Sequence, residues 1–235
     1  MQAVILAGGK GTRLKPYTTV IPKPLMPLGD LPIIEIILRQ LKAAGIEEII
    51  LALGYLPHLF EAMIGHGDRL GLRIAYAQEP GELGTAGPLA NLLDRLDDHF
   101  LVMNGDLLTT VRYDQVLAAH RAAAVAASIC TFRRDVKIDF GVIESENGYL
   151  ARYIEKPTYS YQVSMGVNAL TRADIAPHLS VGTRLDMPDL LNALMTAGKR
   201  VQTLPQECLW LDIGRHEDYA QATDIFEARK SEFLP

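Results

Sequence analysis

The first 24 residues join an apolar segment to a glycine-rich turn that carries several basic side chains. The turn glycines, at positions 8, 9 and 11, can adopt positive φ and let backbone N–H groups approach a ligand closely. The segment contains no acidic residue. Its basic residues are Lys10, Arg13, Lys15 and Lys23. It therefore has a local charge of +4 in a chain whose net charge is −5, and we expect it to bind an anion.

The spacing of these glycines differs from that of two common phosphate-binding loops. Residues 9–14 lack the third glycine of the G-x-G-x-x-G dinucleotide motif, and no G-x-x-x-x-G-K-[ST] sequence follows. An ordinary strand-to-helix turn with solvated basic side chains is the alternative to a phosphate site.

Composition favours one α/β domain spanning residues 1–235, with 49% hydrophobic and 22% charged residues. Apolar runs are far shorter than the ~18–20 residues that a membrane helix needs, and no basic region precedes the N-terminal apolar segment. We therefore expect a cytoplasmic protein that is not bound to a membrane. The mild acidity also argues against a nucleic-acid partner. Cys130 and Cys208 have no metal or redox spacing and are expected to be buried thiols.

The first half of the chain alternates between strand and helix patterns. Strands are expected over 3–7, 46–53, 72–77 and 100–104. Helices are expected over 32–44, 57–64 and 85–96, the last one capped by Thr85. This order predicts a three-layer, Rossmann-like domain with a mostly parallel sheet. Ligands bind beyond the carboxyl ends of such strands, so the turn at 8–13 should converge with Gly105-Asp106.

The second half predicts an antiparallel insertion into this sheet. A helix over 113–122 and a strand over 126–132 come first. Asn147-Gly148, between segments 140–144 and 149–155, is then a strong signal for a two-residue hairpin. Helices are expected over 186–196 and 215–229, and no C-terminal β-helix is expected after them.

Several motifs, in order along nearly the whole chain, resemble those of sugar-1-phosphate nucleotidyltransferases, which join a nucleoside triphosphate to a sugar 1-phosphate. The first is residues 6–14 followed by Pro22-Lys23-Pro24. The others are Leu83-Gly84-Thr85-Ala86-Gly87-Pro88-Leu89, Asn104-Gly105-Asp106, Phe140-Gly141-Val142, Glu155-Lys156-Pro157 and Trp210-Leu211-Asp212-Ile213-Gly214. The resemblance implies a nucleotide-binding half, about 1–110, and a sugar-phosphate-binding half, about 111–235, which holds the insertion.

The implied reaction is attack by a sugar 1-phosphate oxygen on the α-phosphorus of the triphosphate, with pyrophosphate as leaving group. The resemblance assigns Mg²⁺ to Asp106 and Asp212, two carboxylates of the kind that this hard cation prefers. It makes Arg13, Lys23 and Asp106 the catalytic residues. The planar fork of Arg13 suits the β- and γ-phosphates, and Lys23 is a point charge for the α-phosphate.

The resemblance also assigns binding residues. The nucleotide-binding set is Leu6, Ala7, Gly8, Gly9, Gly11, Thr12, Arg13, Gln78, Gly84 and Thr85. The sugar-phosphate-binding set is Gly141, Glu155, Lys156 and Gly166. In these sets Gln78 meets the base, Glu155 accepts sugar hydroxyls and Lys156 holds the sugar phosphate. A solvated strand end at Gln78 and a surface ion pair at Glu155-Lys156 are the alternatives.

Residues 83–89 look most like those of mannose-1-phosphate or heptose-1-phosphate guanylyltransferases, so we expect GTP and a mannose- or heptose-like substrate for polysaccharide or glycoconjugate synthesis. A glucose-1-phosphate thymidylyl-, uridylyl- or cytidylyltransferase is the alternative. Glu82 and Ser164-Met165-Gly166 depart from the family pattern, so the identity of the sugar stays open. A non-catalytic regulatory protein that binds nucleotide-sugar is a second alternative. A glycosyltransferase is a third, although Asn104-Gly105-Asp106 has only one carboxylate of an Asp-x-Asp motif. Whether the chain forms a homo-oligomer stays open.

Overall fold

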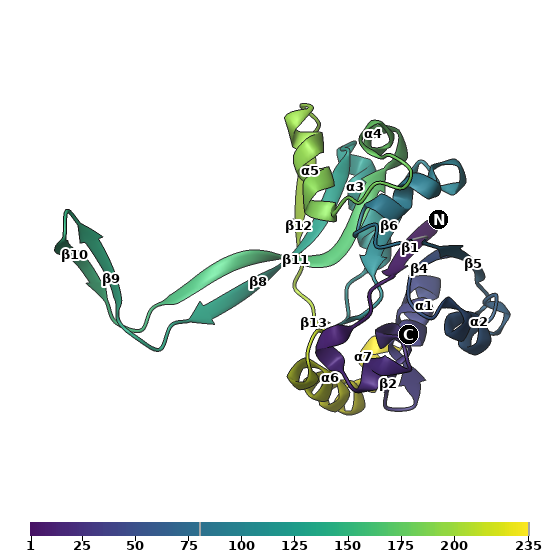
Figure 1. Ribbon diagram of the computed structural model, residues 1–235, viewed down its shortest axis with the longest axis horizontal. Helices are drawn as coiled ribbons and strands as arrows, with labels where there is room; N and C mark the ends of the chain where they lie inside the picture. The colour runs from purple at the N-terminus through teal and green to yellow at the C-terminus, as the bar shows by residue number, and fades with distance from the viewer. Residues whose placement is uncertain (80, 235) are drawn as a thin grey trace.

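The computed structural model describes residues 1–79 and 81–234, and its centre is a seven-stranded sheet (Figure 1). The strand order is β12-β8-β11-β6-β1-β4-β5. The strands are β1 (Gln2–Ala7), β4 (Glu48–Leu53), β5 (Arg73–Gln78), β6 (His99–Asn104), β8 (Ala127–Lys137), β11 (Thr158–Thr171) and β12 (Val201–Pro205). Strands β6, β1, β4 and β5 are parallel to one another, whereas β11 is antiparallel to both β6 and β8. The expected mostly parallel mixed sheet is therefore confirmed.

Helices cover both faces of this sheet. The helices are α1 (Ile33–Ala43), α2 (Pro57–Ile64), α3 (Tyr113–Ala123), α4 (Arg172–Ile175), α5 (Met187–Thr196), α6 (His216–Ala228) and α7 (Lys230–Phe233). Successive residues of β1 enter different cores: Ile5 packs with residues of α1, α2, α3 and α6, whereas Val4 packs with residues of α4 and α5. Alternation along an apolar strand thus builds the three layers. No helix in the described part of the chain is both long and apolar enough to cross a membrane.

The prediction of a helix over 85–96 is wrong. The chain instead forms two short 3-10 segments, Gly87–Asn91 and Leu93–Arg95. The backbone N–H groups at the start of this region donate to the carbonyl oxygen of Leu185, so they are satisfied by another segment. The hydroxyl of Thr85 accepts a hydrogen bond from the N–H of Met187 at 2.7 Å. Thr85 therefore caps α5, not a helix of its own.

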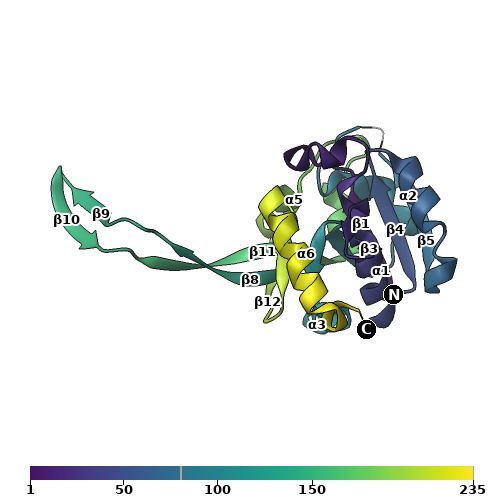
Figure 2. The ribbon, with the colours of Figure 1, turned by 90° about the horizontal axis from the view of Figure 1, so that it is seen from below.

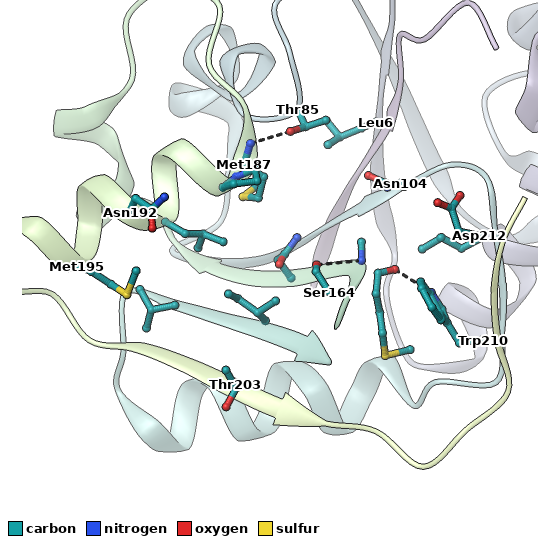
Figure 3. Close-up of a pocket in the computed structure, with 18 residues that line it drawn as sticks. Leu6, Thr85, Asn104, Ser164, Met187, Asn192, Met195, Thr203, Trp210 and Asp212 are labelled. Carbon is teal, nitrogen blue, oxygen red and sulfur yellow. Dashed lines mark hydrogen bonds between the residues drawn. The ribbon is translucent and has the colours of Figure 1, made fainter. Parts of the chain in front are cut away.

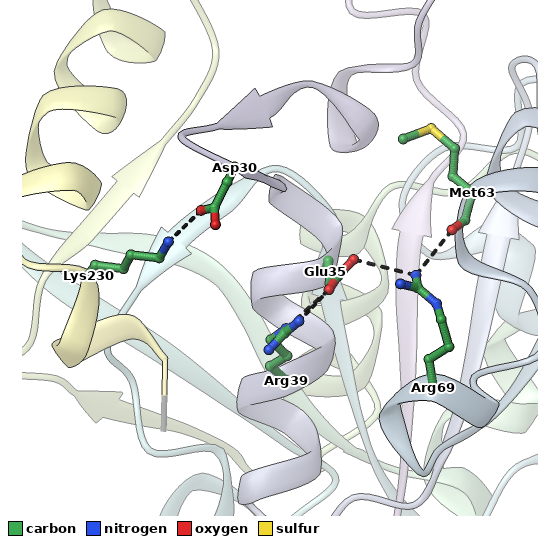
Figure 4. Close-up of polar contacts among 6 residues, drawn as sticks. All are labelled: Asp30, Glu35, Arg39, Met63, Arg69 and Lys230. Atoms are coloured by element: carbon green, nitrogen blue, oxygen red, sulfur yellow. Dashed lines mark hydrogen bonds and ion pairs between the residues drawn. The ribbon is translucent and has the colours of Figure 1, made fainter.

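Polar contacts fix the C-terminal helices and α1 around the core (Figure 4). Glu35 of α1 is buried and accepts a hydrogen bond from Arg39 at 2.7 Å, with Arg69 at 3.7 Å. Lys230 of α7 pairs at 2.5 Å with Asp30, in the turn between β2 (Pro27–Leu28) and β3 (Leu31–Pro32). The Lys230–Asp30 pair thus ties helix α7 to the β2–β3 turn, and the contacts of Glu35 tie α1 to the segment that holds Arg69.

A long two-stranded arm, residues 133–163, projects from the body of the molecule (Figures 1 and 2). Strands β8 and β11 pair along it out to Lys137 and Thr158, and a hairpin of β9 (Val142–Glu146) and β10 (Tyr149–Ile154) forms its tip. Asn147 and Gly148 connect that hairpin with φ of 51° and 84°, as the two-residue signal predicted. The antiparallel insertion is confirmed, but the sequence did not indicate β11 or the length of β8.

Candidate active site

The glycine turn meets Gly105-Asp106 at one edge of the sheet. Strands β1 and β6 are neighbours, with Leu6 opposite Asn104 in the parallel register. The N–H of Gly105 donates to the carbonyl oxygen of Leu6 at 3.0 Å. The carboxyl ends of the two strands therefore bring the basic turn and Asp106 together, as their positions in the sequence predicted.

Lys23 lies directly beside Asp106. It begins the 3-10 segment Lys23–Leu25, and its ammonium group forms an ion pair with Oδ2 of Asp106. Both side chains are largely buried. The second carboxylate oxygen, Oδ1, is buried and finds no hydrogen-bond partner among the described residues. One face of this carboxylate is thus left for a cation or a donor from a ligand.

Asp212 is held close to the same carboxylate by a short pair of strands. In β13 (Trp210–Asp212), Asp212 lies opposite Leu107 of β7 (Leu107–Thr109). The N–H of Ile213 also donates to the carbonyl oxygen of Asp106 at 3.1 Å. Burial raises the pKa of Asp212 and the charge of Asp106 raises it further, while Lys23 and Arg13 act in the opposite direction.

These two carboxylates fit a magnesium ion. Mg²⁺ takes one or two protein carboxylates and completes its octahedron with phosphate oxygens and water. The unpartnered oxygen of Asp106 and the disfavoured charge of Asp212 are both features that a cation would relieve. The described residues contain no group of three His, Cys, Asp or Glu side chains arranged to hold a metal. A substrate would accordingly have to supply several of the remaining ligands.

Three pockets meet at this point, and Leu6 lines all of them. The glycine-loop pocket, of about 470 Å³, lies between residues 8–12 and residues 82–85. The basic pocket, of about 250 Å³, is lined by Arg13, Lys23 and Asp106. The apolar pocket, of about 590 Å³, extends under α5 and ends at Asp212 (Figure 3). The carboxylates therefore stand at the junction of an elongated cleft.

The apolar pocket combines hydrophobic walls with a few polar groups (Figure 3). Met187 and Trp210 contribute apolar surface, and Trp210 donates from Nε1 to the carbonyl oxygen of Met165 at 3.0 Å. Asn168 of β11 also lines this pocket, and its buried Oδ1 has no hydrogen-bond partner within the described part of the chain. A ligand with hydroxyl groups and an apolar face, such as a sugar ring, would suit this pocket.

Glu79, which the sequence interpretation overlooked, enters the glycine-loop pocket. A Cβ atom added to Gly8 would lie 2.7 Å from Oε1 of Glu79, so this glycine makes room for the carboxylate. Burial raises the pKa of Glu79, and a hydrogen bond from the backbone of Leu83 lowers it. The expected base-contacting residue, Gln78, is exposed and lines none of the three pockets. Alternation at the strand end turns adjacent side chains in opposite directions, and this signal could have identified Glu79.

Most of the predicted site residues line the cleft. They are Leu6, Ala7, Gly8, Gly9, Gly11, Thr12, Arg13, Lys23, Gly84, Thr85, Asp106, Gly166 and Asp212. Gly141, Glu155 and Lys156 are on the arm and line none of these pockets (Figure 2). Gly141 lies against the exposed side chain of Tyr153, the nearest neighbour that a Cβ atom at this position would meet. Asn104, Asn168 and Met187 also line the cleft, and the sequence had not indicated them as site residues.

Comparisons with known proteins agree on one family. A family model described as nucleotidyl transferase matches residues 2–229. A mannose-1-phosphate guanylyltransferase of Mycobacterium tuberculosis is 33% identical over 231 residues, which cover 95% of this chain and 64% of the relative. A UTP–glucose-1-phosphate uridylyltransferase of Synechocystis is 30% identical over 241 residues, covering 94% of this chain and 62% of the relative. The chain thus spans just under two thirds of the length of these relatives.

A solved structure supports the fold. The structure of HddC from Yersinia pseudotuberculosis, complexed with GMP-PN, superposes with a TM-score of 0.75 at 22% identity. The match covers 96% of this chain and 99% of that one. At this identity the likeness establishes a common fold, and the Rossmann-like architecture expected from the sequence is confirmed.

Proposed function

The chain belongs to the nucleotidyl transferase family, and on that premise we propose that it transfers a nucleoside monophosphate from a nucleoside triphosphate to a sugar 1-phosphate. The observation that carries the proposal is the position of Asp106 and Asp212, with Lys23 and Arg13, where the three pockets meet. The reaction joins two anions, so it needs positive charge at the place where both substrates meet.

The pockets suggest where each substrate binds. The nucleoside enters the glycine-loop pocket, built mainly from the half of the chain before residue 110, and the triphosphate extends into the basic pocket. The sugar enters the apolar pocket, built mainly from the half after residue 111, where Asn168 offers its unpartnered oxygen to a hydroxyl group. Backbone N–H groups of the glycine turn face the phosphates.

In this arrangement an oxygen of the sugar phosphate attacks the α-phosphorus as the bond to the bridging oxygen of pyrophosphate breaks. Lys23 offsets charge at the α-phosphate, and Arg13 holds the departing pyrophosphate through its planar guanidinium group. Asp106 and Asp212 would hold Mg²⁺, which supplies further positive charge to the phosphates when bound. Lys23 and Asp106 are paired with each other, and the β13–β7 pairing positions Asp212 beside them.

Glu79 favours a guanine base. The edge of guanine presents two adjacent donors, the ring N1–H and the exocyclic amino group, and an ionised carboxylate can accept both. Glu79 is a half-buried carboxylate beside Gly8, where such an edge would arrive. With the guanylyltransferase relatives, this supports GTP as nucleotide and a mannose- or heptose-like sugar 1-phosphate as acceptor.

The experiment that tests the proposal measures pyrophosphate release by the purified protein with Mg²⁺. GTP, dTTP, UTP and CTP are each paired with mannose, heptose and glucose 1-phosphates. The highest catalytic efficiency is expected for GTP with a mannose-like acceptor. Preference for another nucleotide would keep nucleotidyl transfer and overturn the guanylyl assignment. Nucleotide-sugar binding without pyrophosphate release from any pair would favour the regulatory alternative.

A further inference from the structure

The arm is an exposed structure that requires a packing partner. None of residues 133–163, all of which the structure describes, is buried. Among the described residues, half of the large hydrophobic side chains that are exposed lie on this arm. They are Val136, Phe140, Ile143, Tyr149, Leu150, Tyr153 and Tyr161. Because a two-stranded ribbon has little stability alone in water, a surface of this kind is expected to be covered by another molecule.

The apolar pocket, in turn, lacks a charge that its proposed substrate requires. Of the described residues that line it, Asp212 alone is charged, and its charge is negative. The arginines nearest to it, Arg13, Arg134 and Arg215, line an adjoining pocket that shares Trp210 and Asp212. A sugar 1-phosphate bound in the apolar pocket would therefore benefit from a further cation at its mouth.

The arm carries a cation of this kind, but it points away from its own pocket. Ser164 lines the apolar pocket, and β11 runs outward from there to Thr158, just before Lys156-Pro157. At about 3.3 Å per residue, Lys156 is roughly 26 Å along the chain from Ser164. Seven consecutive positions from Ser164 to Thr158 are paired with β8. To reach its own pocket, the arm would have to break or sharply fold this ladder.

We propose that two copies of this chain exchange arms, so that the outer end of each arm enters the cleft of the other copy. Each site would then consist of the body of one chain, with Asp106 and Asp212, and of Glu155 and Lys156 of the partner subunit. Lys156, with φ of 44°, has a left-handed conformation that is unfavourable outside glycine and lies in the connection between β10 and β11. This inference rests on the proposed nucleotidyl transfer to a sugar 1-phosphate.

An exchange of arms accounts both for the exposed apolar side chains of the arm and for the missing cation in the apolar pocket. A two-fold dimer covers the apolar side chains of both arms and supplies both pockets with a cation, using the same contacts twice. The length and pairing of β8 and β11 favour this arrangement because the arm leaves the body as an extension of the central sheet and needs no hinge (Figures 1 and 2).

Complementation between two inactive variants tests the proposal. One variant is defective in the body, Asp106→Asn, and the other is defective in the arm, Lys156→Ala. In co-expressed mixtures, half of randomly paired dimers are mixed, and each mixed dimer has one site with an intact body and an intact arm. Pyrophosphate release should therefore recover to about one quarter of the wild-type rate. If each site used its own arm, every chain would keep its defect and the mixture would be no more active than its parents.

A matched control mixes two body variants, Asp106→Asn and Asp212→Asn, which should not complement each other. Sedimentation provides a readout that does not depend on activity: the wild type should be a dimer, and Tyr149→Ser with Leu150→Ser at the arm tip should shift it towards monomer. An active wild-type monomer, or a dimer without complementation, would overturn the exchange. A wild type without transferase activity would instead refute the proposed function, while sedimentation still decides whether the arms mediate a dimer.

Discussion

The ammonium group of Lys23 forms an ion pair with Oδ2 of Asp106, while Oδ1 of the same carboxylate remains buried without a partner among the described residues. The lysine thus neutralises one side of the carboxylate. A Mg²⁺ ion held by Asp106 and Asp212 would supply further positive charge beside this ion pair, and Asp106 would then position both cations near one phosphate.

The first prediction is that Asp106→Asn lowers turnover at least ~100-fold, because an amide oxygen carries too little charge to hold Mg²⁺ against water. Pyrophosphate release is measured over a range of Mg²⁺ concentrations, with circular dichroism as a check of folding. Asp114→Asn, which removes an exposed carboxylate paired with Arg112, is the control and should leave turnover unchanged. Full activity of Asp106→Asn at limiting Mg²⁺ would exclude Asp106 as a ligand.

The second prediction is that Asp212→Asn stabilises the fold although it lowers turnover. The pKa of Asp212 is raised in the folded protein, chiefly by burial, so the protonated form stabilises the fold and this contribution is lost as the pH rises through the folded-state pKa. At neutral pH without divalent ions, Asp212→Asn should therefore raise the melting temperature. The same variant should lose turnover. A lower melting temperature would show that the ionised carboxylate supports the fold.

The contact between Thr85 and Met187 predicts a combined effect on stability and binding. Thr85→Val removes the oxygen that caps α5 and should cost about 1 kcal/mol of unfolding free energy. Met187 lines the apolar pocket, so the Michaelis constant for the sugar phosphate should also rise. Thr85→Ser retains the hydroxyl group and serves as the control. If thermal unfolding and kinetics of the two variants agreed, the cap would be unimportant.

Part of the nucleotide side of the cleft could be predicted from local patterns. The glycine turn and Asp106 each come directly after a buried strand, and Lys23 lies in the basic segment that follows the turn. The roles of Lys23 and Asp106 came from the resemblance of their motifs. Asn168 and Met187 could not be predicted in this way, because they reach the cleft through pairing of β11 with β6 and through the packing of α5.

On the arm, the local turn could be predicted from the sequence but the direction of the hairpin could not. Asn147-Gly148 identified the hairpin correctly, because a two-residue turn is a local property. The direction of that hairpin depends on the length of the β8–β11 ladder, which no local pattern specifies. Gly141, Glu155 and Lys156 therefore remain predictions as site residues. Whether they contribute to a site depends on whether the arm enters the cleft of a second copy of the chain.

Buried His120 predicts sensitivity to acid. Burial, with the nearby charges of His99 and Arg121, lowers its pKa from 6.5 to about 4, and it contacts Ser128 at 2.9 Å. A lowered pKa means that stability present above pH 6.5 is lost as the pH falls towards 4, by up to ~1.4 kcal/mol per pH unit. Urea unfolding at several pH values should show this slope. The slope should decrease in His120→Gln and persist in His58→Gln, which alters an exposed histidine.

The last prediction concerns the base. Glu79→Gln replaces one of two acceptors with an amino group, which would oppose a donor on the guanine edge. A donor left unpaired in a partly buried site costs about 1–3 kcal/mol, so the catalytic efficiency with GTP should fall roughly 5- to 150-fold.

Uracil presents a single ring N–H between two carbonyl groups, so Glu79→Gln should lower the catalytic efficiency with UTP less than that with GTP. The ratio of the two catalytic efficiencies should therefore decrease. Competition kinetics with equimolar GTP and UTP measure this change directly. Gln78→Ala is the matched comparison, since its side chain is adjacent in sequence but exposed outside the three pockets. If Gln78→Ala narrowed the preference and Glu79→Gln did not, the base would be recognised through Gln78, as the sequence resemblance first implied.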